Sequence, residues 1–170
     1  MLVKFLIALG GLYHVLATAV AMMSVFHFMR MLRGVEVRHP LWRRLHTQAE
    51  AHLWVSGVLL VALGMYATGW AKYLDNPKLW TKVCLVTLWS LNSWWMKRHL
   101  ARASQTERLA MFGISLGSLL YGSFLGVAKP LAYGEWPFVY FLGGYAMTVL
   151  ACAWAMLAWL RQPRAVGTAA

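Results

Sequence analysis

The stretch FLIALGGLYHVLATAVAMMSVFHFM, residues 5–29, decides the class of fold. It contains no charged residue, and it exceeds the roughly 20 apolar residues that a helix needs to cross a bilayer. A secretory signal is the alternative reading, because Lys4 precedes the run and Ala17-Thr18-Ala19 has the form of a cleavage site. The apolar run is too long for a signal peptide. The stretch therefore predicts a first transmembrane helix.

Four further apolar runs follow this stretch, at about residues 53–70, 79–96, 109–128 and 136–160. Of the 170 residues, 61% are hydrophobic and 12% are charged, whereas about a quarter are charged in soluble domains. Backbone groups in lipid must hydrogen-bond internally, so membrane-spanning segments form helices or closed barrels. The alternation of apolar and polar residues that is typical of barrel strands does not occur in this sequence. We therefore expect residues 1–170 to form one all-α domain, an integral membrane bundle of five transmembrane helices.

Basic residues are distributed unevenly between the two sides of this predicted bundle. Eleven of the sixteen Lys and Arg residues fall after the first span, after the third span or in the C-terminal segment. The positive-inside rule then places the N-terminus outside and the C-terminus in the cytoplasm of a multi-pass protein of the bacterial inner membrane. The net charge of +11 is explained by this topology, so we expect membrane lipid and not nucleic acid as the partner.

Small and polar residues indicate how the spans pack. We expect Pro40 to begin the second helix, with polar first turns ahead of its apolar part. Span 109–128 carries glycines at near-four spacing, which lets neighbouring helices approach closely and favours a central position for this span. Asn92 is expected to form an interhelical hydrogen bond. The glycines are Gly113, Gly117, Gly122 and Gly126.

Three histidines lie at membrane depth, where a polar residue is costly unless it is paired or used. His14 is expected near the midplane, and His27 and His52 near the inner ends of their spans. The depths of His14 and His52 then differ by about 10 Å, whereas His27 and His52 match. Two imidazoles on adjacent helices can bind haem iron, and other transition metals use the same nitrogens. Each histidine can equally form only a hydrogen bond to a neighbouring helix.

The other histidines and two intramembrane cations have weaker indications of function. His39, His46 and His99 fall in or beside the predicted cytoplasmic loops, and we expect no ligand role for them. Lys82 lies one turn inside the outer edge of the third span, and Arg30 lies at the inner edge of the first. Each can extend to the membrane surface, or it can bind an anion such as a porphyrin carboxylate.

Soft ligands are concentrated in residues 22–31, MMSVFHFMRM. Thioether and imidazole groups together suit copper(I), although methionine is also an ordinary lipid-facing residue. The two cysteines, Cys84 and Cys152, lie inside apolar runs and are expected to be inert. The sequence contains no phosphate-binding loop, nucleophile elbow, zinc signature or carboxylate pair, so hydrolase and nucleotide chemistry are not expected and no catalytic residue is indicated.

These features together resemble a known family. The chain is similar to the bacterial membrane-bound, haem-containing protoporphyrinogen IX oxidases of the HemJ type and to the related copper-resistance D (CopD) transmembrane domain. The likeness covers most of the chain. It is carried by Leu12-Tyr13-His14, Arg30, Arg43-Arg44-Leu45, the helix start Leu79-Trp80-Thr81-Lys82, and Val127-Ala128-Lys129-Pro130.

The resemblance implies a haem b-binding or porphyrin-handling redox protein. As an oxidase it would pass electrons from protoporphyrinogen, through the haem, toward a respiratory-chain acceptor. His14 and His52 would bind iron or substrate, with His27 as the substitute ligand, and Arg30 and Lys82 would pair with carboxylates. Two alternatives remain open: a copper-handling transport protein, and a cofactor-free structural or assembly subunit of a larger membrane complex. Either a homo-oligomer or a hetero-oligomer is compatible with the sequence.

Overall fold

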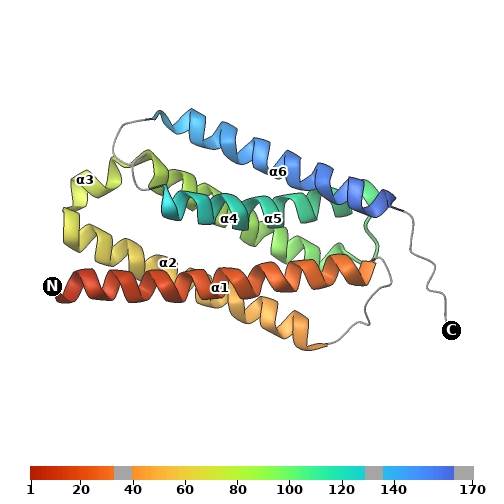
Figure 1. Cartoon of the computed structure of the whole chain (residues 1–170), viewed down its shortest axis with the longest axis horizontal. Helices are drawn as coiled ribbons and strands as arrows, with labels where there is room; N and C mark the ends of the chain where they lie inside the picture. Colours follow the sequence, from red (N-terminus) through yellow and green to blue (C-terminus); the bar gives the residue numbers. More distant parts are fainter. Residues whose placement is uncertain (33–39, 129–135, 163–170) are drawn as a thin grey trace.

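The described part of the chain is entirely helical. The computed structural model describes residues 1–32, 40–128 and 136–162, and within these ranges it contains helices and no strand. Five helices are long and one is a single short turn near one end of the bundle (Figure 1). The elements are α1 (Leu2–Leu32), α2 (Pro40–Thr68), α3 (Trp70–Leu74), α4 (Pro77–His99), α5 (Gln105–Val127) and α6 (Phe138–Arg161).

Four of the long helices, α1, α2, α5 and α6, are long and apolar enough to cross a membrane. These are features of a multi-pass membrane protein, in agreement with the prediction from composition. The remaining predicted span, 79–96, lies within α4 but is not among the four. α4 is as long as α5, at 23 residues, but Lys82, Asn92 and Ser93 interrupt its apolar run. Asn92 and Ser93 are buried against other helices, so α4 meets protein on its polar side.

The second helix is much longer than its apolar part. The predicted span began near Leu53, whereas α2 runs unbroken from Pro40 over 29 residues. Proline is favoured at the first position of a helix because its missing N–H would be unpaired there in any case. The polar turns between Pro40 and Leu53 are therefore part of the bundle, and α2 lies antiparallel to most of the length of α1 (Figure 1).

Helix α5 is the centre of the bundle, as the glycine spacing predicted. In its apolar stretch 56% of the residues are buried, against at most 22% in the other three candidate spans. Its closest neighbour is α6. A Cβ atom on Gly113 would lie 2.8 Å from Cβ of Ala153, and one on Gly117 would lie 2.7 Å from a methyl carbon of Val149. Only glycine permits this approach of the two helices.

Specific caps fix the ends of α4 and α5. The Asn76 side chain accepts a hydrogen bond from N–H of Lys78 in the first turn of α4. Ser104 and Glu107 form a reciprocal capping box at the start of α5, which satisfies two backbone donors that the helix itself leaves open. The end of α4 and the start of α5 lie at the same end of the bundle as the end of α6 (Figure 1).

Candidate functional site

The register between α1 and α2 determines which histidines can act together. Nδ1 of His14 lies 2.8 Å from Oγ of Ser56, and Nδ1 of His46 lies 3.0 Å from Oγ of Ser24. In both pairs the two residue numbers add to the same value, which is the signature of straight antiparallel pairing. His14 therefore lies opposite the C-terminal half of α2.

His14 is more enclosed than His52 but less than His27. Its ring is half-buried, and Ser56 on the neighbouring helix fixes the position of Nδ1. The charge of Lys82, from α4, acts on the same ring. Residues of α1 and α2 are thus in contact at His14, and the charge of a residue on α4 reaches the same ring.

His52 lies one helical turn from Ser56 on α2, but its surroundings differ. Its Nδ1 is hydrogen-bonded to the hydroxyl of Tyr13, and the two rings meet edge-to-face with centroids 5.7 Å apart. Both His52 and Tyr13 are exposed. This pair therefore lies at an outer edge of the α1–α2 contact, open to the surroundings of the bundle.

His14 and His52 are closer in level than their predicted depths implied. Ser56, which contacts His14, follows His52 by four residues, so the two histidines differ in depth by about 6 Å, less than the expected difference of about 10 Å. The expectation took Trp70 to lie level with Phe5 at the start of the first span, whereas the register of α1 and α2 places Met65 opposite Phe5. Successive residues on a helix are rotated by about 100°, and His14 is near Lys82 whereas Tyr13 is exposed. The two imidazoles therefore have different partners, Ser56 for His14 and Tyr13 for His52.

His27 is not paired with His52. It is buried, and its ring stacks on Trp42 with centroids 4.6 Å apart and an interplanar angle of 18°. Trp42 precedes His52 by ten residues on the same helix, which corresponds to about 15 Å along the axis. The expected match in depth between His27 and His52 is therefore wrong, for the same reason of register.

The two candidate cations lie far apart. Lys82 is half-buried near the start of α4, whereas Arg30 is exposed in the last turn of α1. Sixteen residues separate Arg30 from His14 on one helix, or about 24 Å. Only Lys82 accompanies His14. Lys78, one turn before it, donates a hydrogen bond to the backbone carbonyl of Ala128 and so links α4 to the end of α5.

His46 was placed beside a loop by the sequence and is instead in the core, only 2% exposed. Both ring nitrogens are used: Nδ1 meets Ser24 of α1, and Nε2 lies 3.2 Å from Oγ of Ser93 on α4. Ser93 in turn donates to the Glu50 carboxylate. The expectation that His46 has no ligand role stays a prediction, and it is compatible with the contacts, since both ring nitrogens already face serine hydroxyl groups.

A sequence signal for His46 did exist. The buried residues of α2 are His46, Ala49, Leu53 and Ser56, which recur at the three- and four-residue spacing of one helical face. The face was missed because it combines two polar with two apolar residues. His39 lies outside the described residues, and His99 stacks on Trp95 at the end of α4.

Other interhelical polar contacts surround this core. The Asn92 amide donates to the carbonyl of Met111 at 2.8 Å and to the Ser115 hydroxyl at 2.9 Å, which confirms the expected interhelical bond. The Lys97 ammonium lies 2.6 Å from the Glu50 carboxylate. These contacts join α4 to α5 and to α2, so the polar residues of α4 serve helix association.

The described residues contain no cluster of three or more His, Cys, Asp or Glu side chains that could hold a metal ion. The methionines of residues 22–31 do not converge either: Met29 is buried, whereas Met23 is exposed. A metal ion bound by the described residues would thus have at most two His, Cys, Asp or Glu ligands at one place. Haem needs fewer protein ligands than a bare ion, because the porphyrin fills four positions.

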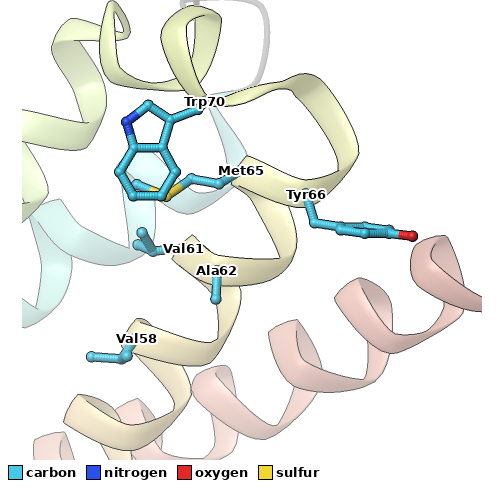
Figure 2. A pocket seen from close by; sticks show the side chains of 6 residues that line it. All are labelled: Val58, Val61, Ala62, Met65, Tyr66 and Trp70. Atoms are coloured by element: carbon cyan, nitrogen blue, oxygen red, sulfur yellow. The ribbon is translucent and has the colours of Figure 1, made fainter.

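The C-terminal half of α2 carries a shallow apolar hollow below the α2–α3 turn (Figure 2). None of its lining side chains is an imidazole, a thiol or a charged group. It is therefore unsuited to bind iron or a carboxylate, and it is separate from His14. The lining residues are Val58, Val61, Ala62, Met65, Tyr66 and Trp70.

The site around His14 is thus defined by three side chains from three helices: His14 itself, Ser56 and Lys82. Ser56 also donates to the carbonyl of His52 at 2.6 Å, so its hydroxyl is held in place from its own helix. The described residues provide no hydrogen-bond partner for Nε2 of His14. Comparisons of the chain with protein-family models, with curated proteins and with solved structures find no match.

Proposed function

We propose that this chain is a membrane protein that binds haem b or a related porphyrin beside His14, and that it acts in redox chemistry. The observation that carries the proposal is the contact between His14 and Ser56, together with the charge of Lys82, which acts on the His14 ring. His14 and Lys82 are also the residues that the family resemblance singles out. They are 68 positions apart in the sequence, on α1 and α4.

The donor set fits a haem with one histidine ligand. Histidines that bind metals commonly use one ring nitrogen for the metal while a second residue holds the other. Ser56 holds Nδ1 of His14, which leaves Nε2 for iron. Lys82 provides a positive charge for a propionate carboxylate in a medium of low polarity. Haem would supply one-electron transfer, and the chain's part is to bind it, orient it and exclude water.

The other predicted ligands take a subordinate place in this proposal. His52 is oriented in the same way by Tyr13, but on the exposed side, where a porphyrin would be less enclosed. His27 and Arg30 lie toward the opposite end of α1, so they do not contact the porphyrin at His14. They bind a second porphyrin or have no part in porphyrin binding. An oxidase activity on protoporphyrinogen, with a respiratory-chain acceptor, is the activity that the resemblance implies.

We further propose that α4 crosses the membrane as a fifth span, with the N-terminus outside and the C-terminus in the cytoplasm of a bacterial cell. Long helices that alternate in direction put the start of α1 and the end of α6 at opposite ends (Figure 1). The end with Arg43, Lys97 and Arg161 is rich in basic residues, which favours the cytoplasmic side. Polar residues of α4 are compatible with this position because they bond to other helices.

The test is the visible absorption spectrum of the purified protein, before and after reduction with dithionite. A bound haem gives a Soret band that shifts on reduction. His14→Ala should abolish or displace this band, because the iron loses its protein ligand. His99→Ala, at the end of α4, is the control and should leave the spectrum unchanged. Loss of the band in His52→Ala or His27→Ala alone would assign the ligand elsewhere.

A second pair of variants tests the cation. Lys82→Met should weaken the binding of added haemin, whereas Lys4→Met, which removes an exposed lysine at the same end of the bundle, should not. A protein that is colourless and takes up no haemin would contradict the proposal. Copper bound by that protein would support the transport alternative, and the absence of both would support a structural or assembly role.

A further inference from the structure

A second pocket lies at the end of the bundle far from the start of α1, between the first turn of α5 and the last turns of α6. Its lining is half polar and half apolar. Gln105 and Arg108 form the polar part, and Met156 and Leu160, together with Ala103, form the apolar part. Both helices are candidate membrane spans, so the pocket is at the level where an apolar span meets the polar headgroups.

Arg108 is the one cation in this lining, and its hydrogen-bonding capacity is incompletely used. Nη2 lies 3.5 Å from the carbonyl of Ala101, a long contact. Nε is buried and has no hydrogen-bond partner among the described residues. A buried guanidinium N–H without an acceptor is unfavourable, and an acceptor that enters the pocket would remove this cost.

The surroundings of the pocket are strongly positive. Arg102 and Arg161 are exposed on either side of it, in the α4–α5 connection and at the end of α6. In the described residues of α5, α6 and the α4–α5 connection the one carboxylate is that of Glu107, which accepts a 2.6 Å hydrogen bond from N–H of Ser104 in the capping box. The first turn of α5 also presents the positive end of the helix dipole. The pocket therefore attracts a negative group.

We propose that this pocket binds the headgroup of an anionic phospholipid. The phosphate accepts hydrogen bonds from the Arg108 guanidinium and the Gln105 amide, and the first part of an acyl chain lies against Met156 and Leu160. A guanidinium matches phosphate oxygens in geometry as well as in charge. An apolar wall beside the cation distinguishes this site from a site for free phosphate. The inference is independent of the porphyrin site, which lies toward the other end of the bundle.

The experiment measures lipid retained by the purified full-length protein. The detergent-solubilised chain is titrated with dioleoylphosphatidylglycerol or with zwitterionic dioleoylphosphatidylcholine, and bound lipid is counted by native mass spectrometry. We expect one molecule of the anionic lipid to bind with clear preference. Inorganic phosphate and glycerophosphate, added in excess, should displace it poorly because they lack the acyl chain.

Three variants that each lower the net charge by one separate the pocket from general electrostatics. Arg108→Gln removes the proposed phosphate ligand and should weaken anionic lipid binding roughly tenfold or more. Gln105→Glu places a carboxylate in the lining and should weaken binding similarly, while an acid in the first turn is favourable for the helix. Arg43→Gln, exposed on α2, is the matched control and should bind as the unaltered chain does.

Each contrary result overturns the proposal in a defined way. Equal retention of the two lipids would mean that the pocket does not select anionic headgroups. Equal binding by Gln105→Glu and Arg43→Gln would place any anionic lipid elsewhere on the surface, even if Arg108→Gln failed to fold. Full displacement by inorganic phosphate would assign the site to the free ion. The absorption spectrum is not expected to change in any of the three variants.

Discussion

Nε2 of His46 lies 3.2 Å from Oγ of Ser93, so that one buried imidazole connects α2 to α4 while its other nitrogen contacts Ser24 on α1. A hydrogen bond between helices has no competing water inside the bundle, and an unsatisfied buried partner is costly. We infer that His46 determines how three helices are placed relative to one another. Its role is structural, and it explains why an imidazole occurs in the first turns of α2.

His46→Ala should destabilise the bundle by about 2–4 kcal/mol, because it removes two hydrogen bonds and leaves a cavity. The effect is measured as a lower melting temperature in detergent. The matched control is His99→Ala, since His99 stacks on Trp95 at the end of α4 and its loss should cost less than about 1 kcal/mol. Equal melting temperatures for the two variants would contradict the structural role of His46.

Glycine substitutions in α5 should have opposite effects at two positions. A Cβ on Gly117 would lie 2.8 Å from Cα of Val149, which belongs to a backbone that cannot easily move. Gly117→Ala should therefore destabilise by about 1–3 kcal/mol. Gly126→Ala meets nothing within 4 Å and should be neutral or slightly stabilising, since alanine favours the helix. Thermal unfolding of both variants in the same detergent checks this pair.

Gly122 gives an internal comparison for the same helix. Gly122 and Gly117 belong to the same spacing pattern in the sequence. A Cβ atom added to Gly122, however, would lie 3.5 Å from a methyl carbon of Leu85, which is an ordinary van der Waals contact. Gly122→Ala should therefore resemble Gly126→Ala. A loss of stability as large as that of Gly117→Ala would show that the α4–α5 contact is tighter than these distances indicate.

The hydroxyl groups behind His14 and His52 distinguish the two candidate ligands. If His14 binds the iron, Ser56→Ala should weaken haem binding and alter the reduced spectrum, because Nδ1 of His14 loses its partner at 2.8 Å. Tyr13→Phe removes the equivalent partner of His52 and should have no such effect. The converse pattern would assign iron to the exposed side of the α1–α2 pair.

Reporter fusions test the proposed topology and the place of α4 in it. A reporter after Ala103 or at the C-terminus should signal cytoplasm, and one after Asn76 should signal the outside, because α4 separates these positions. The basic residues at the ends of α4 and α6 are the reason for this orientation. A cytoplasmic signal after Asn76 would contradict the orientation, and the same signal after both Asn76 and Ala103 would remove α4 from the set of membrane spans.

Sequence patterns predicted the helices better than their mutual register. Pro40, the glycines of α5 and Asn92 mark a helix start, a close contact and an interhelical bond, and each signal is local to one helix. The pairing of His14 with Ser56 is not local. In α1 the residues that face lipid and those that face α2 are nearly all apolar, so the pattern contains little information on which side is inside.

The candidate site was affected by the same limitation. His14 and Lys82 were identified separately because each is a lone polar residue in an apolar run. Nothing in either run indicates that the other is close, since their proximity depends on the packing of three helices. His46 was expected beside a cytoplasmic loop because the first turns of the second helix are polar, whereas its ring contacts Ser24 and Ser93 inside the bundle.

The contact between α2 and α4 has a consequence for how the chain assembles. α1 packs most extensively on α2, and α5 on α6, whereas α4 contacts α2 through side-chain pairs such as Trp54 with Ser90 and Lys97 with Glu50. The α1–α2 and α5–α6 pairs can therefore form first, each by close packing of two neighbouring helices. Their docking then buries one apolar cluster to which α1, α2, α4, α5 and α6 all contribute, and the polar pairs add specific contacts between α2 and α4.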